Sequence, residues 1–149
     1  MTIFQEIAFG SSDYRNECEL RNQVLRIPIG MSLFDEDLTL EREQMHFGLF
    51  DPNRNLVACV IAVAFSPSEA KIRQMAVDIP YQGKGYGRQL IHSLENSLMQ
   101  RGVSLVTLHA RTTAVGFYEK MNYVKVGQAF LEVGIPHITM VKQLLRAKQ

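Results

Sequence analysis

Three glycines within five residues separate a strand-like segment from a helix-like one, and this arrangement limits the fold more than any other feature of the chain. The stretch PYQGKGYGRQL runs from Pro80 to Leu90 and follows IRQMAV, residues 72–77. Glycine lets the backbone adopt positive φ and approach a ligand closely. The first turn of a helix has unpaired N–H groups and the positive end of the helix dipole, which together bind phosphate groups. The sequence therefore predicts a strand, an anion-binding turn and a helix.

Two common phosphate-binding motifs do not fit this turn. A Walker loop requires GxxxxGK[ST], which the sequence lacks. The dinucleotide fingerprint GxGxxG fits Gly83 and Gly85, but Arg88 stands where the third glycine belongs, and the acidic residue expected about 20 positions later is missing. A nucleotide-dependent oxidoreductase is therefore disfavoured. The pattern that fits is [QR]-x-x-G-x-[GA], from Gln82 to Gly87.

The residues before the turn predict a strand, a helix and an antiparallel meander. Residues 2–10 have an imperfect strand-like alternation, and Asp13 can cap a helix over 13–26 that ends before Pro28. Residues 31–40 are ambiguous and can hold a short helix. The stretch MHFGLFDPNRNLVACVIAVAF predicts two strands joined by a turn at Asp51–Asn55, and AKIRQMAV predicts a third strand.

After the turn, helical and strand patterns alternate. Apolar residues recur at helical spacing from Tyr86 to Arg101, and Gly102 ends that helix. The near-continuous apolar run VSLVTLHA is typical of a buried parallel strand. The stretch TTAVGFYEKMN predicts a second helix with Asn122 as its left-handed cap, and YVKVGQAF and PHITMVKQL predict a closing hairpin. This order predicts a mixed sheet flanked by helices.

Composition supports an ordinary globular domain. The 149 residues predict one domain over 1–149, and 46% are hydrophobic and 21% charged. With 16 basic and 15 acidic residues, the charge balance predicts no broad positive surface for nucleic acid. The C-terminal Lys142, Arg146 and Lys148 are interpreted as a solvated tail.

Nothing in the sequence predicts a membrane partner. The longest apolar run, Leu56–Phe65, is far shorter than a membrane span, and the N-terminus lacks the features of a signal peptide. Cys18 and Cys59 have no neighbour at metal-ligand spacing and are interpreted as free thiols. We therefore expect a cytoplasmic protein.

The glycine turn, with MAVDIPY before it, resembles the coenzyme A pyrophosphate loop of the GNAT superfamily of N-acetyltransferases. A second stretch, ARTTAVGFYEKMNY, resembles a later helix of the family in Ala114, Phe117, Tyr118 and the pair Asn122–Tyr123. The predicted element order matches as well, so the resemblance covers about residues 1–145. Three further stretches, LRNQVLRIPIGM, EQMHFGLF and FLEVGIPHITMVK, resemble ElaA-like and YjcF-like members.

The resemblance implies an α/β (α+β mixed) fold, with a central mixed sheet of about seven strands flanked by about four helices. In this fold the fourth and fifth strands splay apart. Two positions depart from the family pattern, because Arg111 and Asn122 stand where members often have asparagine and glycine. Asn122 can adopt the same backbone conformation, whereas Arg111 leaves the usual polar contact to coenzyme A open, although an arginine can reach a phosphate instead.

The resemblance also implies a binding site for acetyl-CoA as co-substrate, without a metal. Backbone groups at the end of the 70–77 strand would pair with the pantetheine arm, and backbone N–H groups of the glycine turn would hold the pyrophosphate. The alternative is a structural glycine turn without a ligand. The residues expected to bind acetyl-CoA are Met75, Ala76, Val77, Gln82, Gly83, Lys84, Gly85, Tyr86, Gly87, Arg88, Arg111 and Phe117.

By the same resemblance, Tyr118 is expected to protonate the departing thiolate, because a tyrosine hydroxyl keeps its proton at neutral pH. The alternative is a packed helix tyrosine. Where some relatives have a carboxylate base on a strand, this chain has Lys71. The candidate bases are therefore His137, Glu132 and His46.

Each candidate base has a structural alternative. His137 can be a turn histidine bonded to the backbone, Glu132 a solvated hairpin residue, and His46 a packed strand residue. His109 is interpreted as a satisfied core histidine. Residues expected to contact the acceptor are His46, Arg21 and Arg26, although the two arginines can equally belong to a solvated helix face.

The sequence thus predicts an acetyl-CoA-dependent N-acetyltransferase acting directly on a primary amine of a small molecule. Two alternatives stay open: acetylation of a protein lysine or N-terminus, and a coenzyme A-binding module without turnover. A homodimer would be compatible with an exposed edge strand at the final hairpin.

Overall fold

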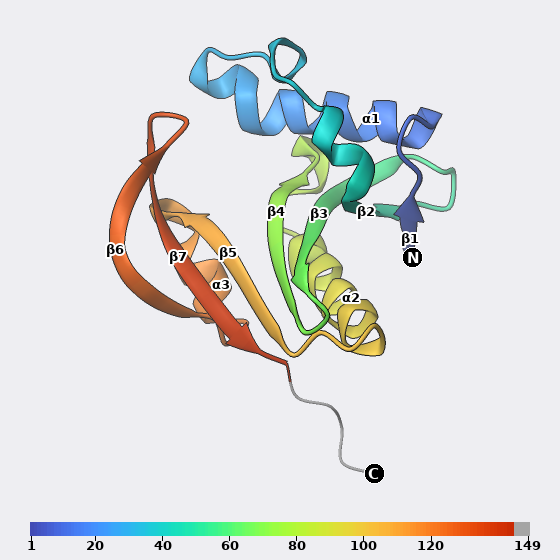
Figure 1. The fold of residues 1–149 in the computed structure, drawn as a ribbon. Coiled ribbons are helices and arrows are strands. Elements are labelled where there is room, and N and C mark those ends of the chain that lie inside the picture. Colours follow the sequence, from blue (N-terminus) through green and yellow to red (C-terminus); the bar gives the residue numbers. More distant parts are fainter. Residues whose placement is uncertain (145–149) are drawn as a thin grey trace. The chain divides into compact units, whose positions relative to one another are not determined.

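The computed structural model describes residues 1–144, in which seven strands form one mixed sheet and three segments are α-helices (Figure 1). The strand order is β1-β2-β3-β4-β5-β7-β6. Strands β4 and β5 pair in parallel, whereas β1–β2, β2–β3, β5–β7 and β6–β7 pair antiparallel. The elements are β1 (Ile3–Ile7), α1 (Ser12–Arg21), β2 (Met45–Phe50), β3 (Leu56–Ser66), β4 (Glu69–Val77), α2 (Tyr86–Gln100), β5 (Leu105–Arg111), α3 (Val115–Glu119), β6 (Val124–Glu132) and β7 (Ile135–Gln143).

The seven-strand mixed sheet confirms the predicted fold class, and three α-helices stand against the expected number of about four. Within residues 1–144, the ambiguous 31–40 region does not form an α-helix. Two 3-10 turns, Leu33–Asp35 and Thr39–Glu43, occupy this part of the chain instead. Short 3-10 turns suit a segment whose polar side chains are bonded individually to other elements, as described below.

Helix α1 begins slightly earlier than its predicted cap. Ser11 is the N-cap, since its side chain accepts a hydrogen bond from the Tyr14 backbone N–H, so the prediction of Asp13 as the cap was wrong. Asp13 lies in the first turn and bonds to Arg54, 2.9 Å away. Past Arg21 the helix continues as a π-helical turn and a 3-10 turn containing Pro28, and Gly30 at φ +76° ends it. The predicted helical range of 13–26 is thus close to the observed one.

The chain divides into two compact units, and three elements run from one unit into the other. The first unit contains Met1–Val63 and Gln74–Leu94, and the second contains Ala64–Arg73 and the described residues from Glu95 onward. Strand β3, strand β4 and helix α2 each cross this division. The single domain expected from the chain length stays a prediction.

Each unit has its own buried apolar residues. In the first unit, Leu90, Ile91 and Leu94 of α2 are fully buried, as the helical spacing predicted, together with Phe47 and Ile61 from the hairpin. In the second unit, the buried face of β5 consists of Val106, Leu108 and Ala110, and Met140 of β7 is also fully buried. Burying each of the larger side chains stabilises the fold by roughly 1.5–3 kcal/mol relative to exposure.

The parallel pairing of β4 with β5 involves only the first four residues of β4. Glu69–Ile72 pair with Leu105–Leu108, and both strands continue beyond these residues. Within β4, Gln74 has a backbone φ of +57°, which non-glycine residues rarely adopt. The expected splay of the two strands stays a prediction.

The C-terminal half differs from expectation in two details. Helix α3 is only five residues long and follows a 3-10 turn at Thr112–Ala114, whereas the sequence predicted a helix over 112–122. Asn122 has φ +71°, which confirms its predicted left-handed conformation. Lys142 belongs to β7 and pairs with Glu95 at 2.9 Å, so it is not part of a solvated tail, while Arg146 and Lys148 lie outside the described residues.

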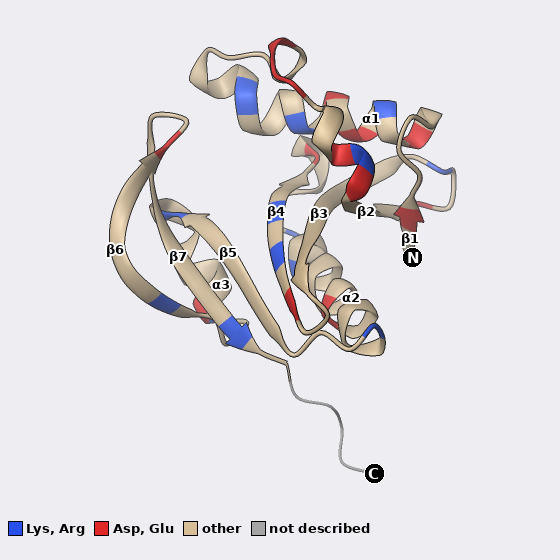
Figure 2. Cartoon of the chain, viewed as in Figure 1, with Lys and Arg blue, Asp and Glu red and all other residues tan. Residues whose placement is uncertain are grey.

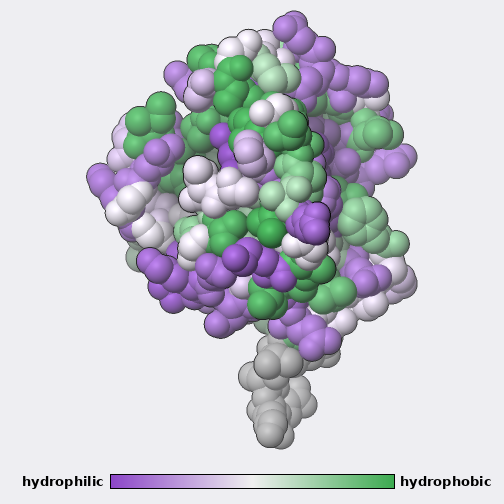
Figure 3. All heavy atoms as spheres, turned by 90° about the vertical axis from the view of Figure 1, so that its left-hand side faces the viewer, coloured by the Kyte–Doolittle hydropathy of each residue, from purple (hydrophilic) through white to green (hydrophobic). Residues whose placement is uncertain are grey.

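Charges of both signs lie side by side along α1 and the segment that follows it (Figure 2). Within residues 1–144, no helix is both long and apolar enough to cross a membrane. Strand β6 stands at the end of the strand order with Val124 and Leu131 exposed. The view from the left of Figure 1 shows hydrophobic and hydrophilic side chains intermingled (Figure 3). A homodimer stays a prediction.

Candidate functional site

The predicted anion-binding turn forms between β4 and α2. Asp78 caps a short 3-10 turn, Ile79–Tyr81, and the chain then passes through Gly83 and Gly85 at φ +75° and +87°. A Cβ atom added at either glycine would meet nothing within 4 Å. Both glycines are thus required by the backbone conformation, and the space beside them is open.

Helix α2 begins directly after the second of these glycines. The Gln89 N–H donates to the Gly85 carbonyl, so the N–H groups of Tyr86, Gly87 and Arg88 lie in the first helical turn, where no helical carbonyl can accept them. Lys84 and Arg88 are both exposed and add positive charge. This end of the first unit is chemically suited to an anion.

The end of β4 is tied to the glycine turn by a side chain. Gln82 donates from Nε2 to the carbonyl oxygen of Val77 at 2.9 Å. Ala76 is buried, whereas Met75 and Val77 are half-buried on the other face of the strand. Tyr81 and Tyr86 contact each other edge-to-face, with ring centroids 5.7 Å apart, and so brace the two ends of the turn.

In the second unit, Phe117 and Tyr118 of α3 pack edge-to-face at 5.0 Å. Tyr118 also contacts Tyr123, and its side chain is almost fully buried. Burial raises the pKa of Tyr118 to about 12, because an ionised phenolate would lose its hydration. The hydroxyl therefore keeps its proton at neutral pH.

Strands β4, β5, β6 and β7 of the second unit place four titratable side chains together. We call Lys71, His109, Glu132 and His137 the imidazole cluster. Nδ1 of His109 lies 2.9 Å from Oε1 of Glu132 and 3.2 Å from Nζ of Lys71, and Nε2 of His137 lies 3.7 Å from Oε2 of Glu132. The sequence analysis had named Glu132 and His137 as candidate bases. In the structure, the imidazoles of His109 and His137 both lie beside the Glu132 carboxylate.

The contacts assign the proton on the His109 ring. A carboxylate can only accept hydrogen bonds, so the contact with Glu132 requires a proton on Nδ1. Lys71 then neighbours Nδ1 without donating to it. Burial lowers the pKa of Lys71, with Arg73 lowering it further against the opposing charge of Glu132. Burial alone would raise the pKa of Glu132, but the hydrogen bond from His109 and the positive charges nearby lower it.

His137 is the more enclosed of the two imidazoles. Its side chain is buried, and Nδ1 lies 2.7 Å from the carbonyl oxygen of Ile135, so this nitrogen donates to the backbone as the structural alternative foresaw. The remaining nitrogen faces Glu132. Arg111, expected to contact acetyl-CoA, stands opposite His137 in the β5–β7 register.

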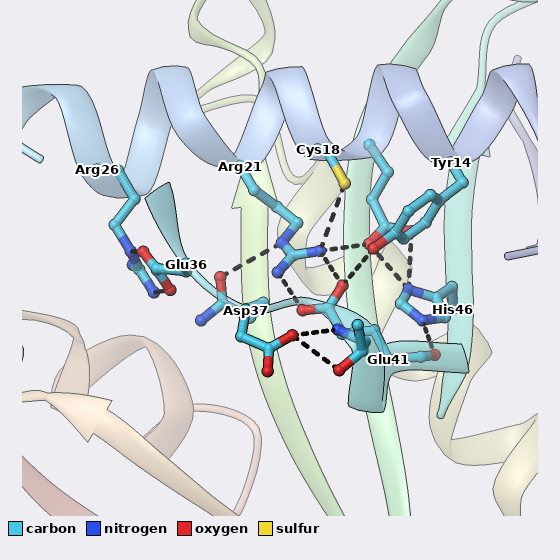
Figure 4. Close-up of polar contacts among 11 residues, drawn as sticks. Tyr14, Cys18, Arg21, Arg26, Glu36, Asp37, Glu41 and His46 are labelled. Carbon is cyan, nitrogen blue, oxygen red and sulfur yellow. Dashed lines mark hydrogen bonds and ion pairs between the residues drawn. The ribbon is translucent and has the colours of Figure 1, made fainter. Parts of the chain in front are cut away.

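A different polar group lies buried in the first unit, around Arg21 (Figure 4). We call Tyr14, Glu17, Arg21, Glu41 and His46 the arginine network. Arg21 donates to Glu17 at 2.9 Å and, through two nitrogens, to both oxygens of Glu41 at 2.8 and 2.6 Å. The hydroxyl of Tyr14 donates to Glu41, and Nε of Arg21 donates to Gln74. No buried side-chain nitrogen or oxygen within residues 1–144 lacks a partner.

His46 completes the charge balance of this network. Nδ1 faces the Glu17 carboxylate at 2.9 Å and Nε2 faces the Glu41 carbonyl oxygen at 2.9 Å. Both partners are acceptors, so both ring nitrogens must carry protons. Burial lowers the pKa of His46, but the hydrogen bond and charge of Glu17 outweigh burial and raise it overall. Two buried carboxylates thus face two buried cations.

This placement does not support the expected acceptor contacts. Arg21 and His46 are 0% and 1% exposed, and their polar atoms bond to the protein, so Arg21 does not lie on a solvated helix face. Arg26 is buried as well and pairs with Glu36 at 2.7 Å. This ion pair attaches the chain after the Leu33–Asp35 turn to the helical segment that contains Arg26. Glu17, Glu41 and His46 have metal-ligand spacing, but the guanidinium of Arg21 binds both carboxylates.

Sequence reasoning did not name Tyr14, Glu17 or Glu41, and it interpreted His109 as a core histidine. Glu17 and Arg21 have the i, i+4 spacing of an ion pair, but spacing alone does not distinguish a buried pair from an exposed one. Glu41 lies just beyond the ambiguous segment. His109 had a usable signal, because it alternates with Leu108 and Ala110 and therefore points to the opposite face of β5.

Comparison with known proteins agrees with this architecture. Residues 32–144 match the family model of the acetyltransferase (GNAT) domain. An uncharacterised Bacillus subtilis protein, YyaT, is 31% identical over 113 residues, which cover 76% of this chain and 75% of YyaT. Escherichia coli ElaA has a TM-score of 0.79 at 19% identity, covering 95% of this chain and 99% of ElaA.

An aminoglycoside 6'-N-acetyltransferase solved with coenzyme A has a TM-score of 0.76 at 16% identity, covering 99% of both chains. At such low identities, the two structural likenesses show a shared fold alone. The family model and YyaT each extend over about three quarters of the chain. The chain therefore belongs to the GNAT family of acetyltransferases.

Proposed function

We propose that the chain transfers the acetyl group of acetyl-CoA directly to a primary amine of a small molecule. The observation that carries the proposal is the open glycine turn before α2. Gly83 and Gly85 adopt positive φ, the space at their Cβ positions is empty to 4 Å, and the first-turn N–H groups of α2 follow directly. A diphosphate is the kind of anion that such a turn binds.

Within the proposal, each expected residue has a role that suits its chemistry. The N–H groups of Tyr86, Gly87 and Arg88 would bind the pyrophosphate, and the exposed Lys84 would add charge. Backbone groups of Met75, Ala76 and Val77 would pair with the pantetheine arm, although the Val77 carbonyl already accepts from Gln82. Arg111 would bind a phosphate and Phe117 would contact the coenzyme.

Tyr118 would supply the proton that the leaving thiolate needs. As the amine nitrogen bonds to the thioester carbonyl carbon, the C–S bond breaks and its electron pair stays on sulfur. A hydroxyl whose pKa is about 12 is protonated at neutral pH and can donate to that sulfur. No cysteine is needed as nucleophile, in keeping with Cys18 and Cys59 being buried.

The small-molecule acceptor is the preferred choice between two amine classes. The choice follows the acceptor class in the name of one structural neighbour, the aminoglycoside N-acetyltransferase, and the shared fold itself does not distinguish the two classes. A protein lysine or N-terminus is the alternative outcome of the same assay.

Calorimetric titration with acetyl-CoA and, separately, NADH tests the proposal first. We expect saturable acetyl-CoA binding and no NADH binding. Thiol release is then measured with spermidine, tyramine, kanamycin and a lysine-containing peptide with a free N-terminus. Turnover with any of the first three supports a small-molecule acceptor, and turnover with the peptide alone supports the alternative. A folded protein that does not bind acetyl-CoA would overturn the proposal.

Gly85→Asp tests the turn itself. Its side chain adds a negative charge where the pyrophosphate would bind, and φ +87° strains any non-glycine residue. We expect acetyl-CoA to bind at least about tenfold more weakly, equivalent to ~1.4 kcal/mol. Gly10→Asp is the matched control, because Gly10 has φ +80° and open space but lies in another turn. Equal weakening in both variants would remove the turn from the binding site.

Tyr118→Phe tests the proposed acid. The phenylalanine keeps the ring that packs against Phe117 and Tyr123 but has no proton to donate. We expect kcat to fall by about 10²-fold or more, with acetyl-CoA affinity nearly unchanged. Wild-type kcat in this variant would leave the acid role to another group.

A further inference from the structure

Acetyl transfer to an amine needs a group that removes a proton from the acceptor ammonium, and the four histidines differ in what their ring nitrogens contact. Both nitrogens of His46 are bonded inside the arginine network. His137 is buried and uses one nitrogen on a backbone carbonyl while the other faces Glu132. His92 is exposed on α2, and nothing within residues 1–144 orients it by a hydrogen bond or ion pair. This leaves His109.

His109 is held in place but has one nitrogen to spare. Its Nδ1–H donates to Glu132 at 2.9 Å, and the ring of Phe130 packs edge-on at 4.9 Å. No residue among 1–144 bonds to its Nε2, and 27% of the side chain is exposed. The lone pair of Nε2 therefore has a fixed direction, on a side chain that is partly exposed. A base oriented by a carboxylate through its other nitrogen is an arrangement suited to proton transfer.

Charged groups surround His109 from every strand packed beside it. Lys71 and, by strand alternation, Arg73 come from β4, Arg111 is the next residue on the same face of β5, and Glu132 and His137 come from β6 and β7. Glu132 is the only carboxylate among these groups, and it lies on Nδ1. No carboxylate among them blocks Nε2 or competes for its lone pair.

We infer that His109 is the general base of the acetyl transfer, with Nε2 as the proton-accepting atom; this inference rests on the proposed function. The acceptor ammonium gives one proton to Nε2. The freed amine forms the C–N bond with the thioester carbonyl carbon, and the C–S bond breaks with its electron pair on sulfur. The thiolate takes the proton of Tyr118, and the second amine proton reprotonates Tyr118 through solvent. Release of the proton on His109 to solvent restores the base.

Glu132 is a positioning residue in this step. It keeps the proton on Nδ1 and thereby the lone pair on Nε2. Without the carboxylate, the neutral ring could place its proton on either nitrogen, and the imidazolium that forms during the step would lose its counter-charge. Glu132→Gln should therefore lower kcat/KM.

The kinetic test uses His109→Asn, whose amide can still donate to Glu132 but cannot accept the proton. The acceptor is whichever amine of the panel above gives the highest wild-type turnover. We expect kcat/KM to fall by about 10²–10⁴-fold at neutral pH while acetyl-CoA affinity is unchanged. The loss should shrink at high pH, where the amine loses its proton without help. His92→Asn is the matched control and should retain wild-type kinetics.

A second measurement does not depend on turnover. In protein labelled with ¹⁵N-histidine, multiple-bond ¹H–¹⁵N spectra distinguish the two neutral tautomers, and the signals absent from His109→Asn identify His109. We expect the Nδ1–H tautomer in the wild type and a mixture in Glu132→Gln. A neutral wild-type His109 with its proton on Nε2 would overturn the inference.

The outcomes separate the inference from the proposed function. A wild type that turns over an amine while His109→Asn keeps the same kcat/KM profile overturns the inference alone. A wild type that neither binds acetyl-CoA nor acetylates any member of the panel overturns the proposed function and the inference with it.

Discussion

Two histidines in this chain are held by glutamates at the same distance, yet they serve different purposes. Nδ1 of His46 lies 2.9 Å from Glu17, and Nδ1 of His109 lies 2.9 Å from Glu132. Nε2 of His46 is bonded to the Glu41 carbonyl, whereas Nε2 of His109 has no partner within residues 1–144. The first pair is fully buried, and the second is 27% and 44% exposed.

The difference shows that the second nitrogen, and not the shared carboxylate, decides what such a pair can do. Where both ring nitrogens donate to acceptors, the imidazolium is fixed, and the pair contributes to stability and local order. Where one nitrogen keeps an accessible lone pair, the pair can move a proton. This contrast predicts that mutations in the arginine network act on stability and mutations in the imidazole cluster act on catalysis.

The largest expected effect on stability comes from Arg21→Ala. Removing the guanidinium leaves two buried carboxylates facing each other, with only His46 to offset their charge. Breaking a buried ion pair from one side costs about 3–5 kcal/mol. Urea unfolding should therefore show that much loss in the free energy of unfolding.

Arg15→Ala is the matched control, because Arg15 is exposed on the same helix. Its change should stay within about 0.5 kcal/mol. If both variants lost the same free energy, the network would be no more stabilising than a surface arginine, and the contrast between the two regions would fail.

A smaller effect is expected from titrating His46. The pKa of His46 is raised in the folded protein, so its contribution to stability is fully present below the unfolded value of about 6.5 and is lost as the pH rises through the folded pKa. A tenfold tighter hold on the proton in the folded state is equivalent to about 1.4 kcal/mol of stability. The stability difference between wild type and His46→Gln should therefore shrink as the pH is raised above about 6.5.

Unfolding free energies at several pH values check this, with His92→Gln as the exposed-histidine control. A difference that stays constant over this pH range would mean that His46 is not the imidazolium its two acceptors require.

The sequence predicted most of the fold because the fold depends on local signals. Period-two and helical spacing placed all seven strands and helix α2 close to their observed ranges, and Asn122 and the glycine turn were placed by backbone rules. The resemblance to GNAT enzymes supplied the topology that periodicity cannot give. The prediction was wrong where two nearby residues can fill the same role, as with Ser11 and Asp13, of which Ser11 is the N-cap.

The polar groups were harder to predict because burial is a property of the assembled chain. Glu17 and Arg21 lie one helical turn apart on the same helix. Glu41 and His46, however, lie 20 or more residues further along the chain than their partners, and no spacing rule links them to Glu17 and Arg21. The same holds for Glu132, which reaches His109 from another strand. Only the alternation of β5 carried a signal, namely that His109 faces away from Leu108 and Ala110.

The smallest expected effect compares the two glutamates directly through the same change. Glu132→Gln removes a charge from a side chain that is 44% exposed, and exposed ion pairs contribute about 0–1 kcal/mol, so the free energy of unfolding should change by at most about 1 kcal/mol. Glu17→Gln removes a fully buried charge that balances Arg21 and His46, and should cost several times more. Paired urea unfolding curves measure both. Equal losses would mean that Glu132 contributes as much to stability as Glu17, and the expected division between a stabilising network and a catalytic cluster would fail.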